Sequence, residues 1–371
     1  MISIYHLVFI VILLGVILEG VTRKKYNKFF CLTYLFLSIL VTFRYGQGTD
    51  YFNYWSIYDT VPSIARQGFW TFWNSPHFGQ IGWRLIISIF KSFGVGFVAI
   101  TSIISAIDML FLFIFIRKYY QYRFLALFLA YHTFILSYIL NTQKQGLMMC
   151  IFLAVVFPLY LKNDLIKYTI GVLLLTTIHK IAPVYLALIA FKKIGFLRNR
   201  KTQFALIGFF WAIGFGICIV LGIRPPIAVI ERLGMFVLVQ IIYMSYRDKE
   251  SLPSYFQDMM NIYAFSMMLY GLFQSEFLMV SVSRTAILGK VFEISIIGIL
   301  MLHVNKNRGI VYLGIVSMVC VMYVKNINMY LTEGTYNSKY SFINYPYISV
   351  LDIGDIANYR YVNYNSTYSE E

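Results

Sequence analysis

The chain has 371 residues, of which 59% are hydrophobic and only 13% are charged, and its formal net charge is +15. Soluble proteins average about 25% charged residues, so this composition excludes a soluble protein and indicates an integral membrane protein. The Lys and Arg residues lie in short clusters between apolar runs, where membrane topology accounts for them, and we expect no nucleic-acid partner. The four cysteines lack the paired spacing of a metal site or a disulfide framework: Cys31, Cys150, Cys218 and Cys320.

Apolar segments recur along most of the chain, and we expect an all-α polytopic protein with about ten to twelve transmembrane helices. The membrane domain covers residues 1–330, and a polar, Tyr-rich tail covers residues 331–371. Cations between the first two spans place that linker inside under the positive-inside rule: Arg23, Lys24, Lys25 and Lys28. The loop at residues 46–78 is therefore expected outside, and a second loop is expected at about residues 224–256.

The external loop begins with Arg44-Tyr45-Gly46-Gln47-Gly48-Thr49-Asp50-Tyr51-Phe52-Asn53-Tyr54. Glycines permit positive φ, arginine matches phosphate with a fork of donors, and tyrosine rings suit sugar faces. These features favour a binding loop. A second interpretation is an interfacial turn, in which Arg44 extends to water, the aromatic residues form a belt, and Asp50 caps the next helix.

Three further segments bear on the topology. Trp55, Trp70 and Trp73 are expected to anchor the loop at the interface, and residues 83–90 are expected to form an amphipathic helix along the outer surface. Residues 168–191 are either one span or two half-helices that meet near His179. We favour the broken or re-entrant pair, because it keeps the cations that follow inside. Residues 227–246 are either a poor span or an external amphipathic helix.

Polar residues within the spans cost about 2.5–3.5 kcal/mol each at a helix centre. His179 and Lys180 interrupt an apolar stretch and are interpreted as a proton acceptor beside a phosphate-binding cation, or as a helix break that reaches water. Lys144 and Gln145 lie at an outer helix end, where function and anchoring are equally supported. Three other residues are expected to be structural: His132, Asp108 and Glu293. Lys290 is expected to pair with Glu293.

Several cations map to the outer face, where the positive-inside rule depletes them: Arg44, Arg84, Lys144 and Arg284. This surplus predicts an anionic ligand. The sequence contains neither a Gly-rich phosphate loop followed by Lys and Ser/Thr nor a paired outer Asp motif for a metal. We therefore expect a lipid-borne, phosphorylated, sugar-bearing substrate and no metal or other cofactor.

The order of these residues resembles the EpsG family of bacterial membrane proteins across nearly the whole chain. The matching elements are Arg44 with Gly48-Thr49-Asp50-Tyr51 and Tyr54, then Asn141 with Lys144-Gln145, His179, Arg284, and Tyr345-Pro346-Tyr347. The chain departs from the family pattern at three positions. Lys144 stands where the family usually has arginine, Gln80 where it usually has glutamate, and Lys180 where it usually has a small residue. Lysine lacks the bidentate fork of arginine, so the role of Lys144 does not transfer directly.

The resemblance implies a Wzy-type polymerase that joins undecaprenyl-diphosphate-linked repeat units into capsular or extracellular polysaccharide. The reaction would take place at the outer face of the bacterial cytoplasmic membrane, with other polysaccharide-assembly membrane proteins as further partners. The expected catalytic residues are Arg44, Asp50, Lys144, His179 and Arg284. The expected substrate-binding residues are Thr49, Tyr51, Tyr54, Arg84, Gln145 and Lys180. The alternatives are a polysaccharide ligase and a non-enzymatic flippase or transporter of the lipid-linked oligosaccharide.

Overall fold

A computed structural model describes residues 2–48, 50–75, 79–222, 227–244, 252–272, 287–303, 308–333 and 347–351. Within these ranges the regular structure is helical, and the one extended pairing is an isolated bridge between Arg44 and Ser349. Five helical segments there are long and apolar enough to cross a membrane: Ile4–Thr22, Phe97–Tyr119, Gln143–Leu161, Arg200–Val220 and Gly309–Ile327. Four shorter apolar helices accompany them: Asn27–Thr42, Arg123–Ile139, Leu165–Thr176 and Arg232–Met244. The all-α polytopic fold is confirmed.

The chain divides into two compact units. The first unit comprises residues 1–155, 174–180 and 312–371, and the second comprises residues 156–173 and 181–311. The helices that lie wholly in the first unit are α1 (Ile4–Thr22), α2 (Asn27–Thr42), α3 (Tyr51–Thr60), α4 (Ile64–Gln67), α5 (Phe69–Asn74), α6 (Ile81–Ser92), α7 (Phe97–Tyr119), α8 (Arg123–Ala130), the π-helix η1 (Tyr131–Ile139) and α9 (Gln143–Ile151). The helix α18 (Arg308–Glu333) belongs mostly to the same unit.

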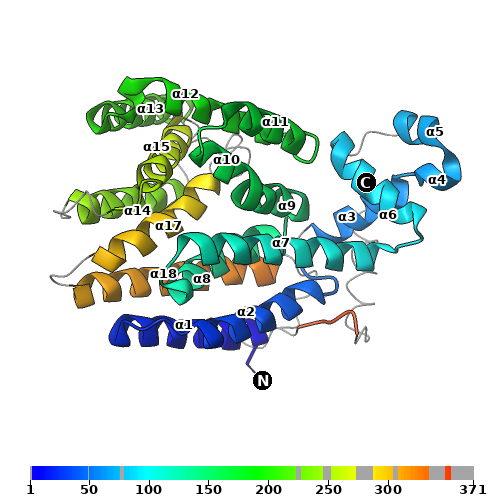
Figure 1. Ribbon diagram of the computed structural model, residues 1–371, viewed down its shortest axis with the longest axis horizontal. Helices are drawn as coiled ribbons and strands as arrows, with labels where there is room; N and C mark the ends of the chain where they lie inside the picture. The colour runs from blue at the N-terminus through cyan, green and yellow to red at the C-terminus, as the bar shows by residue number, and fades with distance from the viewer. Residues whose placement is uncertain are drawn as a thin grey trace. The chain divides into compact units, whose positions relative to one another are not determined.

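In the first unit, α1 packs against α2 and α8, and α2 also packs against α7 (Figure 1). Close approach of α1 and α8 depends on Gly15, because a Cβ there would lie 2.2 Å from the Phe124 ring. The buried Glu19 carboxylate accepts a hydrogen bond from the backbone N–H of Phe124 at 3.0 Å. A carboxylate at the first turn of a helix satisfies a donor that the helix itself leaves unpaired.

The predicted external loop contains three short helices, α3 to α5, and the predicted amphipathic segment is confirmed as helix α6 (Figure 1). One face of α6 is buried through Trp83 and Ile87, which join a hydrophobic cluster with Phe72 of α5. Trp70 and Trp73 are exposed, as interface anchors require, whereas Trp55 packs against the ring of Phe97 at 5.0 Å between centroids.

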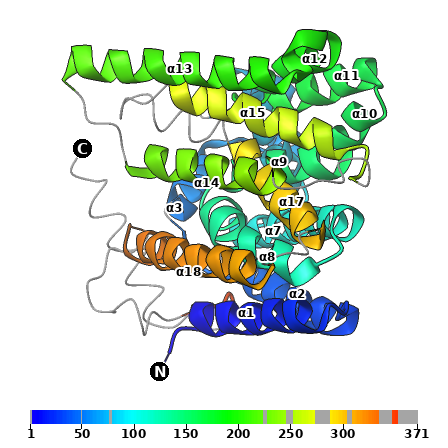
Figure 2. The same ribbon diagram turned by 90° about the vertical axis from the view of Figure 1, so that its left-hand side faces the viewer.

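The second unit begins at Val156, the last residue of the π-helix η2. It then contains α10 (Phe157–Leu161), most of α11 (Leu165–Thr176), η3 (Ala182–Ala187), α12 (Leu188–Lys193), η4 (Gly195–Arg198), α13 (Arg200–Leu221), α14 (Ile227–Met244), α15 (Phe256–Leu272) and α17 (Ile287–His303). Helices α13 and α15 lie side by side (Figure 2). The Trp211 indole N–H of α13 donates to the Met267 backbone oxygen of α15 at 2.9 Å. The η2 segment itself is Phe152–Val156.

The helix α14 packs against α15 and α17, and both interpretations of residues 227–246, a poor span and an external amphipathic helix, stay predictions. Its Arg232 is buried and lies 3.4 Å from the Glu293 carboxylate of α17. Tyr263 of α15 donates to the other carboxylate oxygen at 2.9 Å. Glu293 therefore forms an ion pair with Arg232, which lies 61 positions earlier in the sequence. The positive charge of Lys290, the expected partner, also acts on Glu293.

The predicted break near His179 is confirmed. The helix α11 ends at Thr176, and the 3-10 helix η3 begins at Ala182. The Tyr168 hydroxyl donates to the Tyr185 backbone oxygen at 2.6 Å, and Lys192 donates to the backbone oxygen of Tyr160. The chain therefore turns back on itself and returns Lys192 to the end of α10, as the broken pair requires.

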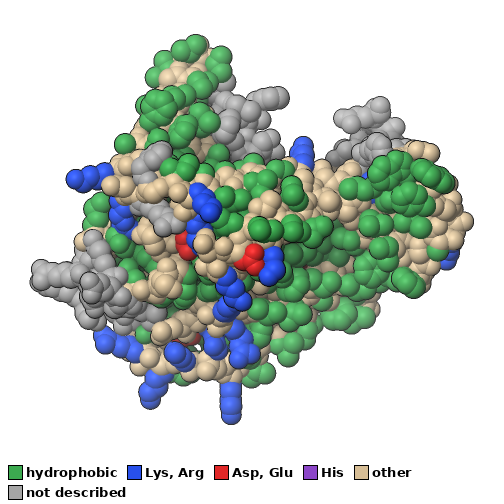
Figure 3. Space-filling model, turned by 45° about the horizontal axis from the view of Figure 1, so that its top comes forward, with side chains coloured by type: hydrophobic (Ala, Val, Ile, Leu, Met, Phe, Trp, Pro, Cys, Tyr) green, Lys and Arg blue, Asp and Glu red, His purple; other side chains and the backbone are tan. Residues whose placement is uncertain are grey.

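Hydrophobic side chains cover most of the right-hand part of the face shown in Figure 3, and Lys and Arg side chains gather toward its lower left. Large apolar residues are exposed along α1 and α2, among them Leu14 (53%), Leu32 (66%) and Leu35 (58%). Exposed apolar surface on a helix of membrane-spanning composition is typical of contact with lipid.

Candidate functional site

Arg44 is buried at the point where the chain leaves α2, with 1% of its surface exposed. Its Nη1 atom donates to the Val41 backbone oxygen and to the Ser105 hydroxyl, both at 2.7 Å. Its Nη2 atom donates to the backbone oxygens of Ile139 and Leu140, both at 3.3 Å. One guanidinium group therefore links the end of α2, the helix α7 and the end of the π-helix η1.

The loop after Arg44 lies against the same turn. Gly46 and Gly48 have positive φ angles of 59° and 104°, which confirms the backbone freedom predicted for them. A Cβ at Gly48 would lie 2.3 Å from the Leu140 backbone oxygen and 3.1 Å from Oδ1 of Asn141. Only glycine permits this approach, so the loop and the residues that precede α9 form one structure.

The C-terminal segment reaches this loop as well. The Tyr45 N–H donates to the Ile348 backbone oxygen at 2.9 Å, and the Val350 N–H donates to the Phe43 backbone oxygen at 2.8 Å. The Tyr347 hydroxyl donates to the Leu40 backbone oxygen at 2.8 Å. Tyr347, the described residue of the Tyr-Pro-Tyr element, therefore lies beside the Arg44 loop.

Lys144 and Gln145 lie in the first turn of α9, where the positive end of the helix dipole favours an anion. Gln145 is buried, and Lys144 is half-buried. A Cβ at Gly79, two residues before α6 begins, would lie 3.8 Å from Lys144 Nζ. The start of α9 is thus close to the chain that enters α6.

The break before His179 packs against the start of α6. The N–H groups of Gly82 and Trp83 donate to the Thr177 backbone oxygen at 2.7 and 3.2 Å. A Cβ at Gly82 would lie 2.3 Å from the Thr177 hydroxyl oxygen. His179 follows with 5% of its surface exposed, and Lys180 is exposed. All these residues belong to the first unit, so its structure brings together the Arg44 loop, the start of α9 and the His179 turn.

Arg84 is buried and holds α5 against α6. Its Nη2 atom donates to the Phe72 backbone oxygen at 2.6 Å and to the Ser75 hydroxyl, and its guanidinium lies 5.0 Å from the centre of the Phe72 ring. The contribution of Arg84 to substrate binding stays a prediction, and the structure gives its side chain a packing role within the external helices.

Tyr51 and Tyr54 are buried in the hydrophobic cluster of α3, α5 and α6. The Tyr51 ring packs against Phe97 with centroids 5.2 Å apart, and the Tyr54 ring lies 5.6 Å from the Trp83 ring. Burial raises the pKa of the Tyr51 phenol, against the opposing effect of Arg44, so this group stays protonated at neutral pH. The two rings position the loop, and their contact with sugar stays a prediction.

Asp50 occupies the N-cap position of α3, but its side chain does not form the capping hydrogen bond. The capping interpretation therefore does not explain its carboxylate. His132 is buried in the π-helix η1, as expected for a core histidine. Three of the predicted motif positions lie outside the described residues, together with Pro346: Thr49, Arg284 and Tyr345.

Asp108 lies near the site, and the sequence does not indicate which residue interacts with its carboxyl group. It is fully buried in α7, one turn after Ser105, and the positive charge of Arg44 acts on its carboxylate. No signal in the sequence joins Asp108 to Arg44, since 64 positions separate them. Among the described residues no group of three His, Cys, Asp or Glu side chains is arranged to hold a metal ion.

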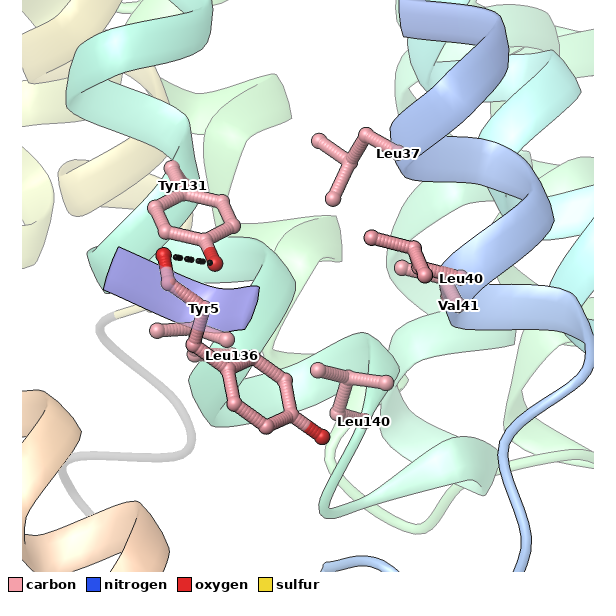
Figure 4. A pocket seen from close by; sticks show the side chains of 7 residues that line it. All are labelled: Tyr5, Leu37, Leu40, Val41, Tyr131, Leu136 and Leu140. Carbon is pink, nitrogen blue, oxygen red and sulfur yellow. Dashed lines mark hydrogen bonds between the residues drawn. The ribbon is translucent and has the colours of Figure 1, made fainter. Parts of the chain in front are cut away.

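A small apolar cavity lies beside Arg44 and is lined by residues of α1, α2, η1 and the turn that follows η1 (Figure 4). Its volume is about 10 Å³, and the Tyr131 hydroxyl donates across it to the Tyr5 backbone oxygen at 3.0 Å. Such a cavity holds about one water molecule. Two of its lining residues, Val41 and Leu140, also accept hydrogen bonds from Arg44 through their backbone oxygens.

Comparisons with known proteins give one match. No curated protein and no solved structure matches the chain. Residues 27–347 match the EpsG family, a range that includes the Arg44 loop, the first turn of α9, the turn at His179 and Tyr347. The chain therefore belongs to the EpsG family and is a polytopic membrane protein of the polysaccharide-polymerase type.

Proposed function

We propose that this protein joins oligosaccharide repeat units carried on undecaprenyl diphosphate into capsular or extracellular polysaccharide, at the outer face of the bacterial cytoplasmic membrane. The observation that carries the proposal is the meeting of three distant segments in one unit: the Arg44 loop, the first turn of α9 and the turn at His179. These segments supply cations, a helix N-terminus and an imidazole, and the last two segments both lie close to the start of α6.

In the proposed step, a hydroxyl oxygen of the acceptor repeat unit bonds to the anomeric carbon of the donor glycan. The bond from that carbon to the diphosphate oxygen breaks, and its electron pair remains on the lipid diphosphate. The hydroxyl proton passes to His179 or Asp50, and histidine has the unperturbed pKa better suited to neutral pH. The reaction requires no oxidant and no second cosubstrate.

Charge that develops on the leaving diphosphate has to be met by fixed donors. Lys144 is the described cation best placed for this, because it is half-buried at a helix N-terminus that itself favours an anion. Arg284 is the second proposed cation. Arg44 contributes by position, since its guanidinium holds the loop and the turn before Lys144 together.

Elongation of a purified lipid-linked repeat unit by the reconstituted protein tests this function. We expect polymer on a gel in the presence of a chelator, and a loss of about a hundredfold to a thousandfold in rate for Lys144→Ala. Lys167→Ala is the matched control, because Lys167 is exposed and pairs with Asp164. Translocation of the lipid-linked unit without elongation would favour the flippase, and transfer of finished glycan to another acceptor would favour the ligase.

A further inference from the structure

The first unit contains an open groove of about 870 Å³ between α3 and the start of α7. It is lined by Phe43, Trp55, Tyr58, Asp59, Phe97 and Ile103, together with Gly96, Val98, Ala99, Ser102 and Val350. Its volume is within the range of sites that enclose organic ligands, about 300–1,000 Å³. None of the residues predicted from the sequence to act on the substrate lines it.

The position of the groove in the fold indicates what it contacts. Its residues on α7 span the first two turns of a helix that is long and apolar enough to cross the membrane. Phe43 and Ile103 are 38% and 37% exposed, so apolar side chains form part of its open rim. A groove at the end of a membrane span with an apolar rim opens toward hydrocarbon.

The chemistry of the lining favours a hydrocarbon chain over a charged or sugar group. Asp59 is the one charged residue among those that line the groove. A single exposed carboxylate would repel a diphosphate, and the other walls are mainly aromatic and aliphatic. A lipid chain buried here would gain about 0.8 kcal/mol for each methylene removed from water.

The groove is also continuous with the Arg44 loop. Phe43 immediately precedes Arg44, and its backbone oxygen accepts a hydrogen bond from the N–H of Val350, which also lines the groove, at 2.8 Å. Trp55 forms part of the lining and packs against Tyr45 with ring centroids 6.3 Å apart. A chain held in the groove therefore lies beside the loop that the proposed chemistry uses.

We propose that this groove binds the isoprenoid chain of the lipid carrier, an inference that rests on the proposed function for the identity of the lipid. The groove holds the hydrocarbon next to Phe43, and the diphosphate at its end extends toward the Arg44 loop and the start of α9. The aromatic wall of Trp55, Tyr58 and Phe97 is rigid, since Phe97 packs against both other rings at 5.0 and 5.9 Å.

Photocrosslinking of the full chain in lipid vesicles tests the proposal. The probe is undecaprenyl diphosphate with a diazirine on its chain, and the comparison probe is a phosphatidylglycerol with a diazirine on its acyl chain. We expect the first probe to label peptides that contain residues 97–103 or 55–59 more strongly than the second at equal concentration. Equal labelling by both probes would make the groove a surface for bulk lipid and overturn the proposal.

A pair of matched variants locates the label. Ala99→Trp fills the groove, whereas Ala106→Trp makes the same change at an exposed position two turns later on the same face of α7, outside the lining. Loss of about two buried methylene contacts lowers binding about tenfold, so labelling of Ala99→Trp should fall by that factor and labelling of Ala106→Trp should not change. Unchanged labelling in Ala99→Trp would contradict the proposal. If that variant does not fold, Ser102→Trp replaces it.

Elongation measured on the same preparations separates this inference from the proposed function. Polymer formation by the wild type without selective groove labelling would overturn lipid-carrier binding in the groove and would support the polymerase function. Selective labelling without polymer would leave a lipid-carrier site in a protein that does not elongate. Labelling that is displaced by free oligosaccharide, and not by undecaprenyl phosphate, would assign the groove to glycan and overturn the proposal.

Discussion

The backbone oxygen of Leu140 accepts a hydrogen bond from Arg44 at 3.3 Å, and the same oxygen would lie only 2.3 Å from a Cβ added at Gly48. Two features of the Arg44 loop, its cation and its second glycine, thus act on one atom of a segment more than 90 positions away. The loop is shaped by this backbone contact, and the contact places it beside the first turn of α9.

Replacement of Arg44 should impair both the site and the fold. Arg44→Ala leaves buried backbone oxygens without their donor, which costs about 1–3 kcal/mol for each group, so we expect no polymer and a lower melting temperature. Arg44→Lys should restore only part of the polymer formation and part of the melting temperature, because one ammonium group does not reproduce the planar fork that links three elements. Polymer length on a gel and thermal unfolding of the purified protein measure the two effects.

The control for Arg44 is Arg66→Ala, because Arg66 is exposed on the short helix α4. It should leave both measurements near wild type. Full activity of Arg44→Lys with normal stability would support the interfacial-anchor interpretation, in which any cation at the end of the second span is sufficient.

The contact at Gly48 can be separated from its backbone conformation. Gly48 and Gly68 both have positive φ, at 104° and 84°, but a Cβ at Gly68 has nothing within 4 Å. Alanine at either position costs about 1 kcal/mol of backbone strain. Gly48→Ala also pushes against the Leu140 oxygen, so it should lower polymer formation much more than Gly68→Ala does. Equal effects in the elongation assay would argue against the loop contact.

The sequence predicts the parts of this site that have local signatures. Glycines with polar neighbours indicate the shaped loop, and a polar pair inside an apolar stretch indicates the break at His179. The partners of Arg44 leave no such trace, since three of its four acceptors are backbone oxygens, which every residue type carries. The sequence therefore predicts a functional cation at this position and its side of the membrane, but only the fold reveals that the Arg44 guanidinium is buried against backbone oxygens.

Glu293 illustrates the same limit in the second unit. Local spacing points to Lys290, one turn away, and the charge of Lys290 does act on Glu293. Helix packing adds an ion pair with Arg232 of another helix at 3.4 Å. The sequence gives no sign of this second partner, because the i, i+3 pattern describes neighbours within one helix only.

Removal of one member of the Arg232–Glu293 pair should destabilise the protein strongly. A buried charge without its partner costs about 3–5 kcal/mol, whereas replacing both members by apolar residues is often neutral. We expect Glu293→Met and Arg232→Met to lower the melting temperature, and the double variant to recover most of the loss. Polymer formed per folded molecule should stay unchanged in the double variant, and its loss there would give the pair a part in the chemistry.

Labelling of introduced cysteines tests the expected sidedness of the external helices. The buried Ser63 is a poor site, since its hydroxyl contacts Ser92 at 3.1 Å, whereas the neighbouring Ala65 is exposed. Ala65→Cys should react with an impermeant thiol reagent in intact cells, and Lys25→Cys should react only after lysis. Both variants need a background without the native cysteines, because Cys31 is exposed. The reverse pattern would place the whole site on the inner face.

The position of His179 depends on a glycine in another helix. The N–H of Gly82 donates to the Thr177 oxygen at 2.7 Å, and a Cβ at Gly82 would lie 2.8 Å from that oxygen and 2.3 Å from the Thr177 hydroxyl. Gly82→Ala must therefore displace the turn that leads to His179. We expect it to reduce elongation by a factor similar to that of His179→Ala, with protein abundance near normal.

The matched control is Gly314→Ala, which changes an exposed glycine of α18 where a Cβ has nothing within 4 Å. It should elongate normally. The combination of Gly82→Ala with His179→Ala carries the argument further, because two changes that act through one group are not additive. The double variant should be no slower than His179→Ala alone. A further large loss in the double variant would mean that the start of α6 acts on the substrate by itself, and that its contact with Thr177 does not serve to position His179.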